Sequence, residues 1–307
     1  MNRRRFLSIF ASTAVSATIA GPFAASASMS RWQGVALGAR AEILIDHPYA
    51  EELVDAARAE IVRLEKIFSL YLEDSALSKL NRKGELTSPP LELVELLSLA
   101  RHINQKSDGL FDPTIQPLWQ LYAKHGVEGS KPSLSEIKEA MIRTGMERVA
   151  VSPDRIVFDT EGMALTLNGI AQGFIADKVA NLLAREGLTN ALVETGEIRS
   201  LGPKRSGRPW KVGIVRPNGK SEETIELTNG ALATSAPDGT LLDPVGKQGH
   251  ILHPRQGAAE MRWRLVTVSA PQAVVADALS TAFCLMEKKQ MTATLAQFPG
   301  AKIKHLA

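Results

Sequence analysis

The chain has 307 residues, of which 44% are hydrophobic and 22% are charged, with 36 Lys and Arg against 33 Asp and Glu. This is the composition of a globular protein, and it excludes a largely disordered chain. The basic excess belongs to the N-terminus, because residues 1–27 hold three arginines and no acid and so leave 33 basic and 33 acidic residues. Balanced charge and few aromatic residues argue against a surface that binds nucleic acid.

The first 27 residues have the pattern of an export signal. A basic head is followed by an apolar run from Phe6 to Ala20 and by the small residues Ala25-Ser26-Ala27. Arg3 and Arg4 resemble the pair of a twin-arginine signal, and a Sec signal is the alternative. We therefore expect a signal over 1–27, one domain over 28–307, and a periplasmic protein.

The cysteine content indicates how the exported domain is built. Cys284 is the single cysteine, so the fold cannot rest on a disulfide framework. No cysteine stands directly after the expected cleavage site, and we therefore expect a protein without a lipid anchor there.

The first elements are read from spacing and capping residues. Residues 34–47 alternate and then run apolar, which predicts a strand, and residues 49–71 have helical spacing. A second helix is predicted over 88–109, with Ser88 as N-cap, and a third over 133–145, which starts with a Ser133/Glu136 capping box.

The second half of the chain is rich in predicted strands. Short strands are expected within 147–159 and 163–167, followed by a helix over 169–187. Further strands are expected within 190–196, 198–202, 209–215, 223–230, 231–236, 263–270 and 301–306, with a helix after 270. Clusters of strands with helices inserted between them favour an α+β fold with a mainly antiparallel sheet.

The helix predicted after residue 270 carries an unusual polar stripe. In "VADALSTAFC" (275–284), Asp277, Ser280 and Thr281 share one face of an otherwise apolar helix. Asp277 and Thr281 offer hard oxygen ligands one turn apart, as Mg²⁺ prefers. The alternative is a partly exposed helix with ordinary polar residues.

Four other segments hold candidate functional residues, each with a plainer interpretation. Gly169 and Gly173 flank the start of a helix, where free backbone N–H groups could bind an anion such as phosphate. The alternative is a strand-to-helix turn that merely needs glycine. "HILHPRQG" (250–257) offers histidines as proton acceptors and an arginine for phosphate, or is only a polar turn. Tyr71 in 68–81 and Phe111 in 107–122 would stack on a planar ring or pack in the core.

Taken together and in order, these segments resemble the ApbE family of FAD:protein FMN transferases. The matching motifs are "FSLYLEDSALSKLN", "SDGLFDPTI", "LNGIAQGFIADKVANLL", "ALATSA", "HILHPRQG" and "VSAPQAVVADALSTA". The resemblance implies a T-fold-like α+β architecture, FAD as substrate and Mg²⁺ as cofactor. It also implies transfer of FMN to a Thr or Ser hydroxyl of an acceptor flavoprotein, with release of AMP.

The resemblance also assigns roles to individual residues. It implies that Asp277, Thr281 and the carbonyl of Gly169 hold Mg²⁺, and that His250 is the base on the acceptor hydroxyl. The implied FAD site consists of Leu37, Tyr71, Leu110, Phe111, Asp112, Thr166 and Gln172.

Two further points concern subtype and alternatives. The signal and "GEIR" (196–199) are similar to the NosX-type members of nitrous oxide respiration, whose acceptor would be a membrane flavoprotein. Two other functions remain open at this point, hydrolysis of FAD to FMN and AMP, and a non-catalytic periplasmic flavin carrier.

Overall fold

The structure of the protein is a computed structural model, which describes residues 30–45, 47, 49–215, 219, 221–243, 248–258 and 261–307. The expected signal over 1–27 lies outside the described residues. Within the described part of the chain, no helix is both long and apolar enough to cross a membrane.

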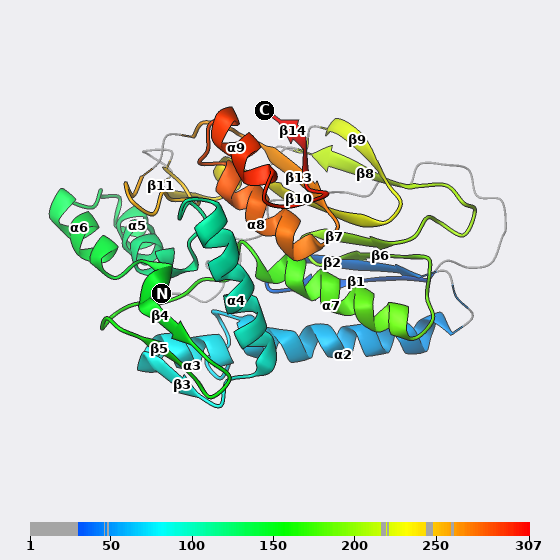
Figure 1. Ribbon diagram of the computed structural model, residues 1–307, viewed down its shortest axis with the longest axis horizontal. Helices are drawn as coiled ribbons and strands as arrows, with labels where there is room; N and C mark the ends of the chain where they lie inside the picture. The colour runs from blue at the N-terminus through cyan, green and yellow to red at the C-terminus, as the bar shows by residue number, and fades with distance from the viewer. Residues whose placement is uncertain are drawn as a thin grey trace.

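A seven-stranded sheet forms the centre of the molecule (Figure 1). Its strand order is β1-β2-β6-β7-β10-β13-β14, and all neighbours are antiparallel. The strands are β1 (Ser30–Ala36), β2 (Ala39–Ile45), β6 (Ala191–Glu194), β7 (Ile198–Leu201), β10 (Gly230–Ser235), β13 (Val266–Ala270) and β14 (Lys302–Leu306). The predicted α+β fold with a mainly antiparallel sheet is confirmed.

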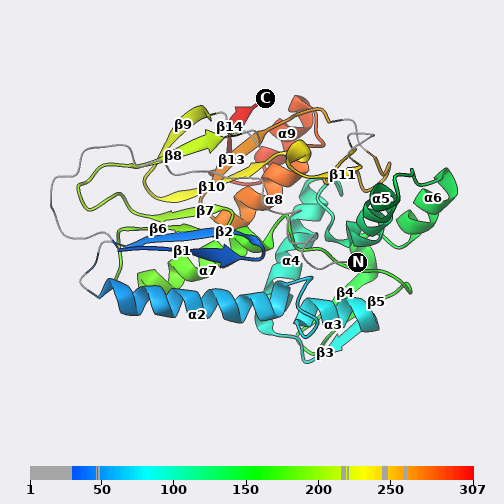
Figure 2. The ribbon, with the colours of Figure 1, turned by 180° about the vertical axis from the view of Figure 1, so that it is seen from behind.

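Helices cover one face of this sheet, and in Figure 2, which is seen from behind, strands β1 and β2 lie in front of α7. They are α2 (Ala50–Phe68), α4 (Leu91–Lys106), α7 (Ala171–Arg185), α8 (Ala273–Phe283) and α9 (Lys288–Leu295). In α2 the buried residues Leu53, Ala57, Ile61 and Leu64 recur every three or four positions, so one stripe of the helix faces the core. The main apolar core lies between these helices and the sheet.

A hairpin covers the other face of the sheet. It consists of β8 (Trp210–Val215) and β9 (Ser221–Leu227), and it encloses a second apolar cluster. Strand β2 contributes side chains to both apolar clusters, because Ile43 and Ile45 pack in the first cluster and Leu44 packs in the second. This alternation is the two-residue period of a strand buried on both faces.

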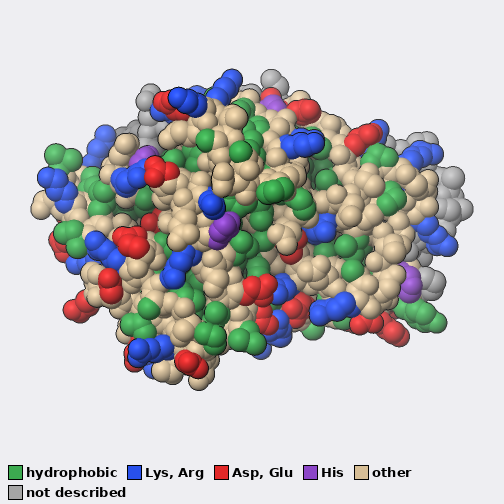
Figure 3. Space-filling view, in the orientation of Figure 1, with side chains coloured by type: hydrophobic (Ala, Val, Ile, Leu, Met, Phe, Trp, Pro, Cys, Tyr) green, Lys and Arg blue, Asp and Glu red, His purple; other side chains and the backbone are tan. Residues whose placement is uncertain are grey.

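The remaining elements gather at one end of the sheet, next to α4 (Figure 1). They are α3 (Ala76–Lys83), β3 (Glu85–Thr87), η2 (Pro113–Ile115), α5 (Gln116–Glu128), α6 (Leu134–Ile142), η3 (Met146–Arg148), β4 (Val149–Val151), β5 (Arg155–Phe158), η4 (Pro237–Gly239), β11 (Leu241–Asp243) and β12 (Gln248–Gly249). A third apolar cluster, which includes Leu118, Tyr122 and Ala140, joins α5, α6 and β11. On the face drawn in Figure 3, acidic and basic side chains are interspersed.

Three predicted elements differ from the structure. The strand expected over 34–47 is a hairpin, because Leu37 and Gly38 have φ of 47° and 84°. The helix expected from Ser88 begins at Leu91 with Pro90 as its N-cap, since Ser88 has a left-handed φ of 48° and Pro90 disfavours a helical backbone at Pro89. Other predicted elements agree with the structure. The helices predicted over 49–71, 133–145 and 169–187 are confirmed as α2, α6 and α7, and the capping box of α6 is present.

The third difference concerns residues 163–167, which form no strand. The side chain of Asn81 donates to the carbonyl of Leu165 (2.9 Å) and accepts from its N–H (2.8 Å). The N–H of Thr166 donates to the carbonyl of Pro113 (2.8 Å). A side chain and a loop thus satisfy backbone groups that a neighbouring strand would otherwise bond.

Candidate active site

An open cavity lies where the N-terminal turn of α7, the end of β10 and α8 meet. Ten of the eleven predicted site residues line this cavity: Leu37, Leu110, Phe111, Asp112, Thr166, Gly169, Gln172, His250, Asp277 and Thr281. They come from segments up to 244 positions apart in the sequence, from Leu37 to Thr281. The structure therefore brings these segments together around one cavity, and the role of each residue stays a prediction.

The oxygen groups predicted to hold a cation lie together. Asp277 is 3% exposed, and Thr281 lies one turn later on the same face of α8. The backbone of Gly169 approaches this hydroxyl so closely that a Cβ at Gly169 would lie 2.9 Å from Thr281 Oγ1. The burial of Asp277 rules out the partly exposed helix that spacing alone left open.

The cavity is rich in carboxyl groups. Asp112, Glu197 and Asp277 line it, and no Lys or Arg does within the described residues. Burial raises the pKa of Asp277 to about 7, and the backbone N–H of Gly173, which donates to Asp277 Oδ2 at 3.0 Å, offsets part of that rise. A negatively charged ligand would be repelled here unless a cation accompanied it.

The donor set suits such a cation. The described residues contain no group of three His, Cys, Asp or Glu side chains arranged to hold a metal. One carboxylate, one hydroxyl and one main-chain carbonyl are instead available at Asp277, Thr281 and Gly169. Mg²⁺ typically takes one or two carboxylates and completes its shell with water and substrate phosphates. The residues present therefore fit Mg²⁺.

Glu197 is a cavity residue that the sequence analysis did not include in the site. It is 5% exposed, and its Oε2 accepts a hydrogen bond from the N–H of Thr234 at 3.1 Å. Burial, followed by repulsion from Asp277, raises its pKa well above the ordinary value. The only local signal was a carboxylate directly after Gly196, whose φ of 96° marks a sharp turn between two buried strands.

His250 lies in the cavity with a defined orientation. Its Nδ1 is 3.2 Å from the carbonyl oxygen of Pro237 and 3.3 Å from that of Thr240. Two acceptors at Nδ1 place the ring proton there, so Nε2 of the neutral ring carries a free lone pair. Burial lowers the pKa of His250 below its usual 6.5, which favours this neutral form at pH 7. His250 is therefore equipped to accept a proton.

Two other lining residues are held by contacts outside the cavity. Leu37 has a left-handed backbone, and its N–H donates to Glu65 Oε1 of α2 at 2.7 Å. Asp112 Oδ1 accepts from the N–H and the hydroxyl of Thr114 at 2.9 and 2.6 Å, which caps η2. Burial raises the pKa of Asp112 to about 6. Both residues thus shape the cavity wall, Leu37 at the cost of a strained backbone and Asp112 at the cost of a buried carboxyl.

Tyr71, the eleventh predicted residue, lies in a second cavity next to the first. Trp119 and Asn168 line both cavities, and Tyr71 hydrogen-bonds the Asn168 side chain. The ring of Tyr71 is 37% exposed and is not part of the core. It is therefore available to a ligand that extends from the first cavity into the second.

Two proposed anion-binding groups are engaged elsewhere. The N–H groups of Ala171 and Gly173, in the first turn of α7, bond the Leu167 carbonyl and Asp277. Arg255 is exposed, pairs with Asp108 at 3.0 Å and does not line the cavity. The site thus relies neither on these N–H groups nor on Arg255 to bind an anion.

Comparison with known proteins identifies the family to which this site belongs. The sequence profile of the ApbE family matches residues 37–303, which is most of the chain. The chain belongs to the ApbE family. All eleven predicted site residues fall inside the matched range.

Named relatives and solved structures agree with this assignment. The FAD:protein FMN transferase of Haemophilus influenzae is 30% identical over 73% of this chain and 69% of its own. That of Treponema pallidum is 29% identical over 85% of this chain and 79% of its own. The crystal structure of the ApbE protein from Thermotoga maritima has a TM-score of 0.80 at 30% identity and covers 90% of this chain and 93% of its own.

A second solved structure resembles the fold to a similar extent. The flavin transferase ApbE from Vibrio cholerae has a TM-score of 0.77 at 26% identity, covering 91% of this chain and 94% of its own. The antiparallel sheet and its helical layer are therefore those of the ApbE fold.

Proposed function

We propose that this ApbE-family protein transfers FMN from FAD to a Thr or Ser hydroxyl of an acceptor flavoprotein and releases AMP. The observation that carries the proposal is the convergence in one cavity of Asp277, Thr281 and Gly169 with His250, whose Nδ1 faces two backbone carbonyls. The family assignment and the activity named for its relatives support the same reaction.

The bond changes define what the site must do. The acceptor hydroxyl oxygen attacks the phosphorus of the FMN half, the bond from that phosphorus to the bridging pyrophosphate oxygen breaks, and AMP leaves. The hydroxyl proton passes to Nε2 of His250, and Nδ1 stays bonded to the carbonyls of Pro237 and Thr240. A base positioned in this way contributes roughly 10²–10⁴-fold to the rate.

Mg²⁺ fits the oxygen groups of Gly169, Asp277 and Thr281, where it would supply charge stabilisation for the phosphoryl oxygens. The chain's own contribution is to orient these groups. Thr195 Oγ1 donates to the carbonyl of Gln172 at 2.8 Å, and the side chain of Gln172 lies against Gly196, where any Cβ would be within 2.5 Å of it. The first turn of α7 is thereby fixed against the turn between β6 and β7.

The flavin would extend toward the second cavity, where Tyr71 offers a ring for stacking. The acceptor must then present its hydroxyl between this cavity and His250. We further propose that the protein is exported, by the twin-arginine route, and that its acceptor is an exported or membrane flavoprotein, with the NosX-type acceptor as the specific case. The sequence pattern over residues 1–27 supports export.

A reaction with purified components tests the proposal. The protein is incubated with FAD and Mg²⁺, with and without an acceptor domain that carries the target threonine, and the products are separated by mass spectrometry. FMN attached to the acceptor, with AMP formed in equal amount, is the expected result. Free FMN formed at the same rate with or without acceptor would instead establish FAD hydrolysis.

Variants distinguish catalysis from flavin carriage. His250→Ala is expected to bind FAD but to release no AMP. His253→Ala, on the same segment and outside the cavity lining, is the matched control. Normal FMN transfer by His250→Ala would contradict the role of His250, and FAD binding without any turnover in the unmodified protein would support a carrier.

A further inference from the structure

Helices α7 and α8 touch through their backbones near their N-termini. A Cβ at Gly173 would lie 2.4 Å from the carbonyl oxygen of Ala273 and 2.7 Å from the nitrogen of Val274. Backbone atoms cannot move aside cheaply, so only glycine permits this separation. Gly169 lies two residues before the start of α7, and Asp277 and Thr281 lie on α8. The contact therefore also sets the distance between the proposed cation ligands.

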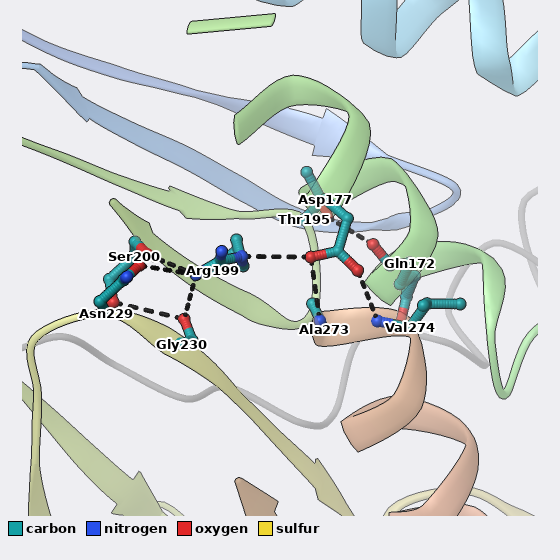
Figure 4. Close-up of polar contacts among 9 residues, drawn as sticks. All are labelled: Gln172, Asp177, Thr195, Arg199, Ser200, Asn229, Gly230, Ala273 and Val274. Carbon is teal, nitrogen blue, oxygen red and sulfur yellow. Dashed lines mark hydrogen bonds and ion pairs between the residues drawn. The ribbon is translucent and has the colours of Figure 1, made fainter. Parts of the chain in front are cut away.

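Asp177, one turn after Gly173 on α7, holds the start of α8 (Figure 4). Its Oδ1 accepts from the N–H of Ala273 at 3.0 Å, and its Oδ2 accepts from the N–H of Val274 at 2.9 Å. Gln272, the N-cap residue of α8, makes no side-chain cap bond. A carboxylate of the neighbouring helix thus performs the capping that α8 does not supply itself.

The arrangement is reciprocal. Asp277 lies four residues after Ala273, as Asp177 lies four residues after Gly173. Asp277 Oδ2 accepts from the N–H of Gly173 at 3.0 Å, so each helix bonds a backbone N–H of the other through a carboxylate one turn from the contact. Any shift of α8 along α7 would consequently turn the Asp277 carboxylate as well.

Arg199 anchors this pair of helices to the sheet (Figure 4). Its Nε lies 3.3 Å from Asp177 Oδ1, and both side chains are mostly buried, at 15% and 13% exposed. Its Nη1 donates to the carbonyls of Ser200 (2.6 Å) and Gly230 (3.0 Å), in β7 and β10. Asp177 is therefore fixed on one side by the sheet and on the other by α8.

We infer that Asp177 is a positioning residue for the cation site. By capping α8 from α7, it holds the Asp277 carboxylate and the Thr281 hydroxyl where the backbone of Gly169 meets them. Asp177 does not line the cavity, so it touches neither the cation nor the substrate and acts from outside the site, through α8 and through the repulsion between its charge and Asp277. The inference rests on the cation role that the proposed function gives to Asp277 and Thr281.

Asp177→Asn is the sharpest perturbation, because it keeps the size of the side chain and replaces one acceptor oxygen with an NH₂ group that faces a backbone N–H. Loss of a partner that orients a metal ligand typically costs 10–100-fold in metal affinity. We expect a loss of about that size for Mg²⁺, measured by isothermal titration calorimetry on the full chain without FAD.

A turnover measurement separates positioning from a purely structural role. In Asp177→Asn the half-saturating Mg²⁺ concentration should rise by the same factor, and kcat at saturating Mg²⁺ should return close to that of the unmodified protein. A purely structural role would lower the thermal midpoint and kcat and leave the half-saturating Mg²⁺ concentration unchanged. That second outcome would overturn the inference.

Two further variants complete the test. Lys178→Ala changes the next residue of α7, which pairs with Glu95 at 2.7 Å, and should leave the Mg²⁺ affinity unchanged. If Asp177→Asn does not fold, Arg199→Ala weakens the same anchor from the sheet side and should also reduce Mg²⁺ affinity. A folded Asp177→Asn or Arg199→Ala variant that binds Mg²⁺ as tightly as the unmodified protein would contradict the inference. Absence of Mg²⁺ binding in the unmodified protein would instead refute the cation role in the proposed function.

Discussion

Asp277→Asn should stabilise the metal-free protein and abolish its activity. In the folded chain the pKa of Asp277 rises from the ordinary 3.8 to about 7, chiefly because the carboxyl is buried. At pH 8 the group is ionised in both the folded and the unfolded chain, and burial penalises the folded state. Each pKa unit is worth about 1.4 kcal/mol, so the penalty is on the order of 4 kcal/mol.

The pH dependence follows from the sign of this rise. Below the ordinary pKa the carboxyl is protonated in both states and contributes no penalty. As pH rises toward about 7 the unfolded state ionises first, and stability is lost progressively until the folded-state pKa is passed. Asparagine stays neutral and can still accept from the N–H of Gly173. The stabilising effect of Asp277→Asn should therefore be absent well below the ordinary pKa of 3.8 and full near pH 8.

Thermal unfolding in EDTA and in excess Mg²⁺ measures this effect. For a domain of this size about 1 kcal/mol corresponds to roughly 2–4 °C, so the variant should melt roughly 10 °C higher at pH 8 in EDTA. Mg²⁺ should raise the midpoint of the unmodified protein only. Asp55→Asn, an exposed carboxylate of α2, is the control and should change neither value. A variant less stable than the unmodified protein in EDTA at pH 8, or equally stabilised by Mg²⁺, would refute this reasoning.

Other predictions concern single residues. Gly173→Ala should destabilise the protein by about 1–3 kcal/mol in urea unfolding, because the clash with Ala273 outweighs the better helix propensity of alanine; a more stable variant would show that α7 and α8 separate freely. FMN transfer should rise with pH through a midpoint below 6.5 and then level off, since burial lowers the pKa of His250 and the base must be neutral; His250→Gln should remove this step. The thiol of Cys284 is buried with a raised pKa, so an aromatic disulfide reagent should label it only after denaturation, and rapid labelling of the native protein would contradict this.

Local pattern was sufficient for much of the fold. The capping box at Ser133 and the apolar spacing of 49–71 and 169–187 predict helices because these signals act within a few residues. The turn at Leu37 was not predictable in this way, since leucine rarely takes a positive φ and Glu65 of α2 holds it there. Residues 163–167 likewise depend on the side chain of Asn81, which only the folded chain brings near.

The site residues also separate into those that local sequence spacing connects and those that only the folded chain brings together. Asp277 and Thr281 lie one turn apart on one helix, so their pairing follows from sequence spacing. Glu197 enters the cavity from the start of β7, 80 positions before Asp277, and no local pattern connects the two. The reciprocal capping between Asp177 and Asp277 is also a property of two packed helices. The implied roles of Gln172 and His250 came from family resemblance, and the structure adds where their side chains lie.

The most direct test of the account is a crystal structure with FAD, in which Mn²⁺ replaces Mg²⁺ so that anomalous scattering locates the ion. We predict one anomalous peak among the Asp277 carboxylate, the Thr281 hydroxyl and the Gly169 carbonyl, in contact with the FAD diphosphate. A peak elsewhere, or FAD bound outside the cavity lined by His250, would contradict it.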